Sequence, residues 1–278
     1  MRAGYGTAQL CNRFFEEPFD TLMLTHAIVR PPAANFDQGQ TTVDLGKPDF
    51  VLALEQHARY CNALRSCGLT LVWLEADSAY PDSTFVEDTA ILTPKTAILT
   101  RPGASSRMGE VLGIELALQR FYSHFQSIVA PGTLDGGDIC GADGHFFIGI
   151  SERTNEQGAK QLADILAREG CTSSTIDIRG VDGILHLKSG VSFLGQRRLT
   201  LIDALAQHPA FASYDIVPIP EQENYAANVL QINQHTIMSA GFPLVAASLR
   251  ELGLNPITLD MSEFQKMDGA LSCLSLRF

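Results

Sequence analysis

The sequence predicts an α/β fold in which five similar modules close into a ring within a single domain. A β-hairpin, a helix and a further strand follow one another five times, with the hairpins spaced roughly 40 to 50 residues apart. No linker rich in Pro, Gly or Ser divides the chain. The strands come as hairpins, whereas a doubly wound sheet would alternate single strands with helices. A five-bladed ββαβ propeller, whose last strand completes the first module, accommodates these observations.

The first module begins with a short strand at 25–30, which Pro31 and Pro32 end. Residues 32–47 are polar and too long for a tight turn, so we expect them to form a lid over a site. A helix is expected at 50–64, where apolar side chains including Val51 and Leu54 share one face. A buried strand at 69–74 then completes the module.

The remaining modules repeat this order along the chain. Hairpins are expected to turn at 94–95, 142–144, 195–197 and 233–234. Helices are expected at 108–121, 155–169, 200–207 and 244–252, and single strands at 127–130, 174–178, 216–219 and 256–259. The apolar run at 274–278 is expected to pair with the strand at 25–30 and close the ring.

Composition narrows the class of protein. A hydrophobic content of 45% with 18% charged residues is typical of a compact globular chain. The net charge of −11 argues against a nucleic-acid partner or an anionic membrane surface. The six cysteines form no CxxC pair or zinc-site spacing, and no apolar run has signal-peptide or membrane-span length. We therefore predict a cytoplasmic protein with reduced thiols, in which 1–21 is a leader and 22–278 is the propeller domain.

Reactive side chains occur at the starts of successive modules, which a ring brings together at its central channel. These residues are Glu87, Asp88, Asp135, Asp138, His186 and Cys273. Taken singly, Asp-Gly-Gly-Asp is a common turn sequence and the histidine of Leu-His-Leu is typical of a core. Taken together, a cysteine, a histidine and an orienting carboxylate are the parts of an activated nucleophile. Further carboxylates suit a planar cation such as guanidinium, and Arg107 and Arg153 suit a substrate carboxylate.

Six ordered motifs make the chain similar to the dimethylarginine dimethylaminohydrolase family, within the guanidine-modifying (pentein) superfamily. They are FVEDTA (85–90), TRPGASSR (100–107), LDGGD (134–138), RTN (153–155), LHLK (185–188) and DGALSCLSLRF (268–278). The resemblance covers about residues 24–278 and is closest to the bacterial members through LGKPD (45–49) and LEQH (54–57). It implies the pentein propeller and the hydrolysis of Nω-methylated arginines to citrulline and methylamine or dimethylamine. It also implies that the reaction requires no metal or cofactor.

The resemblance also implies roles for individual residues. Cys273 attacks the guanidinium carbon to form a covalent thiouronium, His186 transfers protons, and Asp135 takes a carboxylate position where bacterial members often have Glu. The other implied roles are guanidinium binding by Asp82 and Asp88, support by Glu87, α-carboxylate binding by Arg107 and Arg153, and contacts through Gln40 and the Met267 carbonyl. Gln40 stands where some members have a lid leucine.

Two other functions can be weighed against the same motifs. Arginine deiminase or amidinotransferase chemistry requires the same cysteine, histidine and acids, but those families usually have longer chains with insertions. A non-catalytic ring that binds a ribosome predicts the loss of Cys273, His186 or the acids, and all are present. The sequence therefore favours an enzyme acting on a small guanidino substrate. Exposed propeller edges are compatible with a homodimer.

Overall fold

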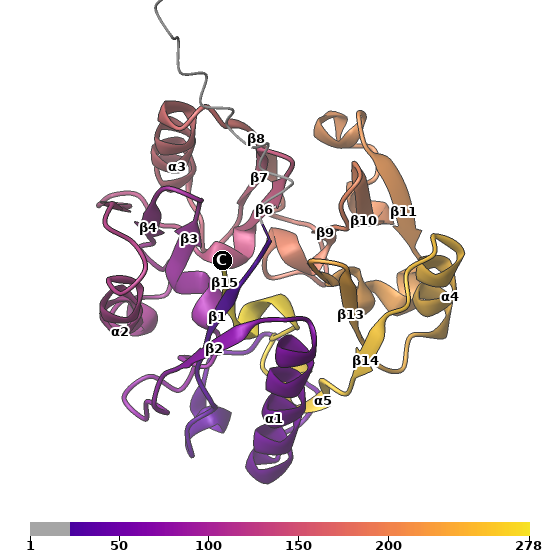
Figure 1. Cartoon of the computed structure of the whole chain (residues 1–278), viewed down its shortest axis with the longest axis horizontal. Coiled ribbons are helices and arrows are strands. Elements are labelled where there is room, and N and C mark those ends of the chain that lie inside the picture. The colour runs from indigo at the N-terminus through magenta and orange to yellow at the C-terminus, as the bar shows by residue number, and fades with distance from the viewer. Residues whose placement is uncertain (1–22) are drawn as a thin grey trace, which may run out of the picture.

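Five three-stranded sheets stand around a central axis like the blades of a propeller, which confirms the predicted fold (Figure 1). The computed structural model describes residues 23–278, and the expected leader at 1–21 lies outside them. None of the helices in this part of the chain is long and apolar enough to cross a membrane.

Each blade contains an inner strand, a middle strand, a connection that is usually helical, and an outer strand. The elements are β1 (His26–Val29), α1 (Phe50–Ser66), β2 (Thr70–Trp73), β3 (Ala90–Leu92), β4 (Ala97–Leu99), α2 (Glu110–Leu118), β5 (Phe125–Ser127), β6 (Ile139–Ala142), β7 (His145–Ile150), α3 (Glu156–Arg168), β8 (Thr172–Asp177), β9 (Val191–Phe193), β10 (Arg198–Ile202), β11 (Asp215–Ile219), β12 (Leu230–Ile232), β13 (His235–Ser239), α4 (Pro243–Glu251), β14 (Ile257–Leu259), α5 (Ser262–Gln265) and β15 (Leu276–Arg277).

The two ends of the described chain share one blade. β15 is its inner strand and pairs antiparallel with β1, with Ala27 opposite Arg277 and Ile28 opposite Leu276. β1 pairs in parallel with β2, and every other blade repeats this pattern of one antiparallel and one parallel pair. The predicted closure of the ring by the last strand is therefore confirmed.

The fourth blade, β9–β11, differs from the prediction because it has no α-helix. Residues 200–202, expected in a helix at 200–207, belong instead to β10, and a short 3-10 turn follows at Asp203–Leu205. The segment Arg-Leu-Thr-Leu-Ile contains two β-branched residues, and its strand buries Leu201 and Ile202 in the core. Pro209 then prevents a helix from continuing through this region.

The helix α1 forms where it was expected but buries a different face. Its first turn is capped by Asp49, whose Oδ1 accepts a hydrogen bond from the Leu52 amide at 3.0 Å. Tyr60 is completely buried, whereas Val51, expected on the buried face, is 65% exposed. The helix therefore packs through small, polar and aromatic side chains, which a simple apolar periodicity does not identify.

Five short 3-10 turns surround the axis, and an inner strand follows each one. They are Val86–Thr89, Gly136–Asp138, Leu187–Ser189, Glu221–Ala227 and Ser272–Leu274. Four of the five neighbouring pairs pack directly against each other, and hydrogen bonds between Asn228 and Ser272 join the remaining pair. Because every inner strand runs from a 3-10 turn to the far end of its blade, the module starts form one ring at one face of the molecule.

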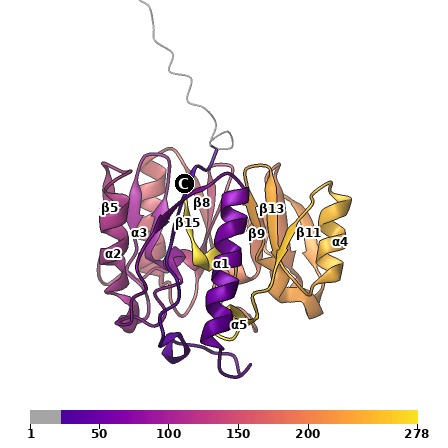
Figure 2. The same cartoon turned by 60° about the horizontal axis from the view of Figure 1, so that its bottom comes forward.

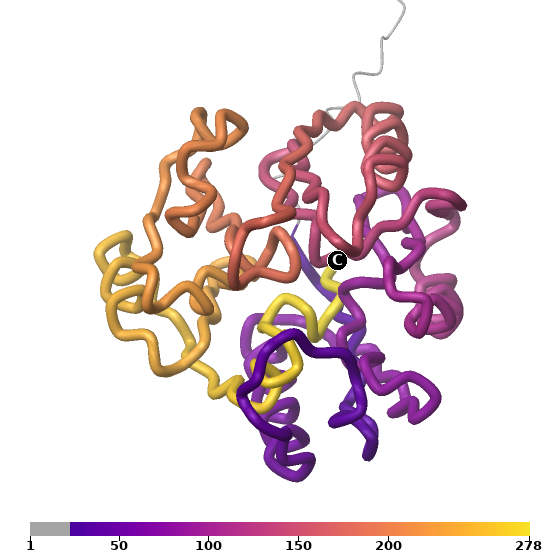
Figure 3. The backbone as a smooth tube through the Cα atoms, turned by 180° about the vertical axis from the view of Figure 1, so that it is seen from behind, coloured from indigo at the N-terminus to yellow at the C-terminus, as the bar shows by residue number. Residues whose placement is uncertain are grey.

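The segment at 32–47, which was expected to form a lid, lies on the same face of the molecule as the 3-10 turns. Figure 2 shows α5 at the lower end of the molecule and the C-terminus at the upper end. Figure 3, from behind, shows the indigo segment at about 30–48 crossing close to the yellow segment at about 260–272. Two side chains of this indigo segment fix it there, because Thr42 binds Asp268 and Thr41 Oγ1 donates to the Lys266 carbonyl at 3.0 Å.

Candidate active site

The ring of 3-10 turns brings the expected reactive side chains close together, and three of them line one pocket. Asp88 lies within the first of these turns, Asp135 and His186 directly precede the next two, and Cys273 is at the centre of the last. Asp88, His186 and Cys273 line the pocket together with Asp82, Arg107, Arg153, Gln40 and Met267. The sequence motifs, more than 180 residues apart, thus form one constellation.

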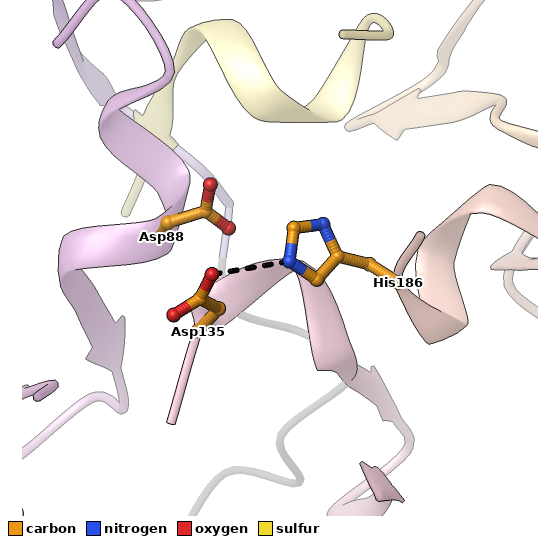
Figure 4. Close-up of side chains that lie close together, drawn as sticks. All are labelled: Asp88, Asp135 and His186. Carbon is orange, nitrogen blue, oxygen red and sulfur yellow. Dashed lines mark hydrogen bonds and ion pairs between the residues drawn. The ribbon is translucent and has the colours of Figure 1, made fainter. Parts of the chain in front are cut away.

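His186 faces two neighbouring carboxylates, those of Asp88 and Asp135 (Figure 4). Its Nε2 is 3.2 Å from Asp135 Oδ2, and one ligand atom each from Asp88, Asp135 and His186 lie within 4.8 Å of one another. Burial opposes protonation of the imidazole, but the charges of Asp88, Asp138 and Asp135 outweigh burial and raise the pKa of His186 to about 9. His186 is therefore an imidazolium in the empty site at neutral pH and is ready to donate a proton.

The same constellation is a poor site for a metal ion. An imidazolium has no lone pair for a metal, and binding would require its deprotonation. Asp88 is already neutralised by Arg107, whose Nη1 lies 2.6 Å from Asp88 Oδ2. The chemistry that this donor set supports is proton transfer beside a bound cation.

Asp135 is held rigidly by its neighbours. Its Oδ1 accepts a hydrogen bond from the Gly103 amide at 2.8 Å, which leaves Oδ2 for His186. The Asp135 amide donates to Thr154 Oγ1 at 3.1 Å. Both side-chain oxygens of this completely buried residue are therefore partnered, and the direction of the carboxylate toward His186 is fixed.

Asp138 is a supporting residue that the sequence placed among the acids without a role. Its Oδ1 accepts from the Leu187 amide at 3.0 Å, next to His186, while Oδ2 accepts from Ser151 and Thr154 hydroxyls at 2.7 and 2.6 Å. Burial raises the pKa of Asp138 to about 6. Asp138 thus fixes the backbone that carries the histidine and does not line the pocket.

Arg107 lines the pocket but is already extensively paired. Its Nε and Nη2 donate to Glu110 at 3.0 and 2.8 Å, Nη1 donates to Asp88, and Nη2 also donates to the Phe85 carbonyl at 3.0 Å. Burial opposes ionisation of Asp88, but His186 and Arg107 together lower the pKa of Asp88 to about 2. Glu110 was not predicted, and only its helical spacing of three residues from Arg107 could have indicated it.

The guanidinium of Arg153, unlike that of Arg107, is not paired with other side chains of the described chain. Arg153 lines the same pocket, is partly exposed, and its guanidinium has no hydrogen-bond or ion-pair partner among residues 23–278. Burial raises the pKa of Asp82, and the positive charge of Arg153 is one of the groups that partly offset this increase. Arg153 therefore provides an unoccupied fork of donors for an anionic group.

Cys273 faces the pocket from the turn that precedes β15. Its side chain is partly exposed, and the thiol is free. Burial, followed by the charges of Glu87 and Asp88, raises the pKa of Cys273 to about 12. Cys273 is therefore a thiol at neutral pH, and a positive charge beside it would favour the thiolate.

Glu87 lies behind the pocket wall, and its carboxylate does not line the pocket. Its Oε1 pairs with Lys188 Nζ at 2.6 Å and Arg277 Nη2 at 3.2 Å, and its Oε2 accepts from Ser272 Oγ at 2.7 Å. These contacts tie the turn containing Asp88 to the turn containing Cys273. Glu87 thus acts on the pocket through its neighbours in the chain.

The lid closes the pocket almost completely. The Gln40 amide lies 3.1 Å from Asp82 Oδ1, and its side-chain Nε2 donates to Ser106 Oγ at 2.9 Å. Gly39 permits this approach, because a Cβ there would lie 2.2 Å from Asp82 Oδ1. The remaining free volume is about 20 Å³, so a substrate can enter only when the lid moves.

Comparison with known proteins agrees with this geometry. The family model described as arginine deiminase matches residues 79–217. The chain is 43% identical to an N(G),N(G)-dimethylarginine dimethylaminohydrolase of Pseudomonas aeruginosa, with 92% of this chain and 100% of the relative covered. It is 35% identical to the enzyme of the same name from Streptomyces coelicolor, with 90% of this chain and 96% of the relative covered.

Solved structures lead to the same group of proteins. A cysteine-to-serine mutant of the Pseudomonas aeruginosa protein complexed with citrulline superposes with a TM-score of 0.89 at 43% identity, over 92% of this chain and 100% of that chain. The N-terminal domain of the cyanobacterial arginine dihydrolase ArgZ superposes with a TM-score of 0.80 at 16% identity, over 92% of this chain and 97% of that one. The second likeness concerns the fold alone.

Proposed function

This chain belongs to the dimethylarginine dimethylaminohydrolase family, and on that premise we propose that it hydrolyses Nω-methylated arginines to citrulline and methylamine or dimethylamine. The observation that carries the proposal is the convergence of Cys273, His186 and the carboxylates of Asp82 and Asp88 on one closed pocket. The citrulline complex of the Pseudomonas aeruginosa relative also supports it. The reaction as written below uses only side chains and water.

The first half of the reaction forms the covalent intermediate. The positive guanidinium lowers the pKa of Cys273, and the thiol releases its proton to water. The thiolate Sγ then adds to the guanidinium carbon to give a neutral tetrahedral adduct. The His186 imidazolium gives its proton to the methylated nitrogen, the C–N bond breaks, and the amine leaves. A cationic thiouronium on Cys273 and a neutral His186 remain.

The second half releases citrulline. Neutral His186 takes a proton from a water molecule, and the resulting hydroxide adds to the thiouronium carbon. The C–S bond then breaks, the new hydroxyl becomes the ureido carbonyl, and its proton passes to the departing sulfur. Cys273 and the His186 imidazolium are thereby restored, with Asp135 orienting the ring in both halves.

We assign substrate binding to the charged side chains that line the pocket. Asp82 and Asp88 bind the guanidinium, and the unpartnered Arg153 binds the α-carboxylate, with Arg107 providing its remaining Nη1 N–H. The Met267 carbonyl and Gln40 complete the wall. Gln40 cannot pack like a lid leucine, so its hydrogen bond to Ser106 replaces apolar contact in holding the lid closed.

The setting of the enzyme is also part of the proposal. Residues 22–278 form the catalytic domain, and the five free cysteines of the described chain suit a reducing cytoplasm. The net charge of −11 opposes a nucleic-acid partner. A homodimer is supported by α2, which exposes Leu112 and Leu116 one turn apart by 62% and 58%. Sedimentation of the wild type and of Leu116→Glu would reveal the dimer by its loss in the variant.

The test of the reaction is citrulline release from asymmetric dimethylarginine and, separately, from arginine. Cys273→Ser is expected to abolish release. Cys61→Ser is a matched control, because Cys61 also lies beside a histidine, with Sγ 3.7 Å from His57 Nδ1, yet is completely buried elsewhere. This control is expected to retain activity. Release mainly from arginine would instead identify an arginine deiminase, and release that survives Cys273→Ser would refute the proposed nucleophile.

A further inference from the structure

A second cavity lies on the opposite side of the ring from the lid. Its volume is about 730 Å³, and it is lined partly by two hairpin turns, at 194–196 and 231–234. These turns lie at the ends of the inner strands that are farthest from the catalytic 3-10 turns. The cavity therefore opens on the face seen in Figure 1, whereas the substrate pocket lies under the lid on the face seen in Figure 3. We refer to it as the hairpin-side chamber.

The lining of this chamber is cationic, although the whole chain is strongly acidic. Lys188, Arg198 and Arg277 line it, and the described lining residues include no Asp or Glu. Arg198 is only partly exposed, and its guanidinium has no hydrogen-bond or ion-pair partner within the described chain. A half-buried guanidinium without a carboxylate favours an anion from solution, because it has lost part of its hydration without replacement.

The floor of the chamber adds to this positive potential. Lys188 Nζ and Arg277 Nη2 both approach the same oxygen of Glu87, at 2.6 and 3.2 Å. One carboxylate thus faces two cations, and its second oxygen is occupied by Ser272 Oγ. Together with Arg198, the chamber therefore carries an excess of positive charge in a concave site where screening is weaker than on an open surface.

We propose that the hairpin-side chamber binds a small organic anion bearing two or more phosphate or carboxylate groups. The unpartnered Arg198 and the Lys188–Arg277 pair beside Glu87 offer two cationic contacts to such a ligand, whereas a single carboxylate can engage only one of them. The cavity volume lies within the range of small-molecule sites. Ser272 and Lys188 line the chamber, and Ser272 directly precedes Cys273, so the bound anion would lie behind the catalytic wall without entering the substrate pocket.

The test is calorimetric titration of the full chain with pyrophosphate and with citrate in a buffer of low ionic strength, with acetate for comparison. Pyrophosphate or citrate is expected to bind at one site, and acetate at least about tenfold more weakly, because it lacks a second anionic group. A preference for pyrophosphate or for citrate identifies the ligand as phosphate- or carboxylate-bearing. Arg198→Ala is expected to weaken binding about tenfold or more, because it removes a charge-assisted hydrogen bond to the anion. Arg198→Lys is expected to weaken binding less, because lysine keeps the positive charge but not the forked guanidinium.

Two control variants distinguish the chamber from other cationic places. Arg197→Ala removes the same charge one residue away, but Arg197 points elsewhere, over the Tyr214 ring and onto the Ser213 carbonyl. Arg153→Ala removes the unpartnered cation of the substrate pocket. Both are expected to leave binding unchanged, with thermal unfolding confirming that every variant is folded. Equal weakening by Arg197→Ala, weakening by Arg153→Ala alone, or no binding of either polyanion would overturn the proposal.

Discussion

The nucleophile should be nearly unreactive until a cation occupies the pocket, and alkylation kinetics can measure this. Burial, followed by Glu87 and Asp88, raises the pKa of Cys273 to about 12. At pH 7 an ordinary thiol with a pKa of about 8.5 is roughly 3% thiolate, whereas a pKa of about 12 leaves roughly 0.001%. A more basic thiolate is also a better nucleophile, with a Brønsted slope of about 0.4–0.5, which recovers about 30-fold of the deficit.

Iodoacetamide, which is neutral, should therefore inactivate the enzyme at pH 7 about 100-fold more slowly than it alkylates free cysteine. The rate should continue to rise with pH beyond 9, where ordinary thiols level off. Chloroacetamidine carries a positive amidinium group that can pair with Asp82 and Asp88. Its rate, normalised to its own reaction with free cysteine, should be much greater than that of iodoacetamide.

Loss of catalytic activity is the appropriate measurement, because the other cysteines can react without inactivating the enzyme. The Glu87→Gln variant provides an internal check, since removing one of the two opposing charges should lower the pKa of Cys273 and speed the reaction with iodoacetamide. Equal normalised rates for the two reagents would refute substrate-assisted formation of the thiolate. An apparent pKa below about 8 for inactivation by iodoacetamide would do the same.

Three other predictions concern the charges around Cys273. The pKa of His186 is raised from 6.5 to about 9 in the folded protein, so its stabilising contribution is complete below pH 6.5 and is lost as the pH rises toward 9. Urea unfolding should show this loss, of about 3 kcal/mol, in the wild type and not in His186→Asn. Arg153→Ala should raise KM about 10- to 100-fold without changing Tm, because Arg153 has no protein partner to lose; an unchanged KM would contradict its assignment to the substrate carboxylate. Arg107→Met should lower the free energy of unfolding by about 3–5 kcal/mol, because two buried carboxylates lose their shared cation; a Tm equal to that of the wild type would refute this.

The propeller could be predicted from the sequence because its repeated order of hairpin, helix and strand is a local property. The fourth blade could not, because the choice between helix and strand at residues 198–202 depends on burial of Leu201 and Ile202 against the neighbouring blade. The buried face of α1 was predicted incorrectly for a similar reason. Its contacts involve Tyr60, whose hydroxyl lies 2.6 Å from Ser275 Oγ more than 200 residues away.

The pocket residues were predictable as a set, while their pairing was not. Motifs at the starts of the modules identify Cys273 and His186, but no spacing in the sequence shows that Arg107 is paired with two buried acids or that Arg153 is not. Such differences depend on the three-dimensional neighbours of each charge. The roles of Glu87 and Arg107 toward the substrate remain predictions.

The pairing of β15 with β1 couples the chemistry to the cooperativity of the whole fold. Cys273 lies in the same short segment as the strand that closes the ring, and Glu87 holds that segment through Ser272 and Arg277. A molecule whose ring opens at this seam would retain four complete blades and yet lose its nucleophile. Catalytic activity is therefore a more sensitive measure of the fraction of molecules with β15 paired to β1 than secondary-structure content is. When this pairing is weakened, activity should be lost before secondary structure.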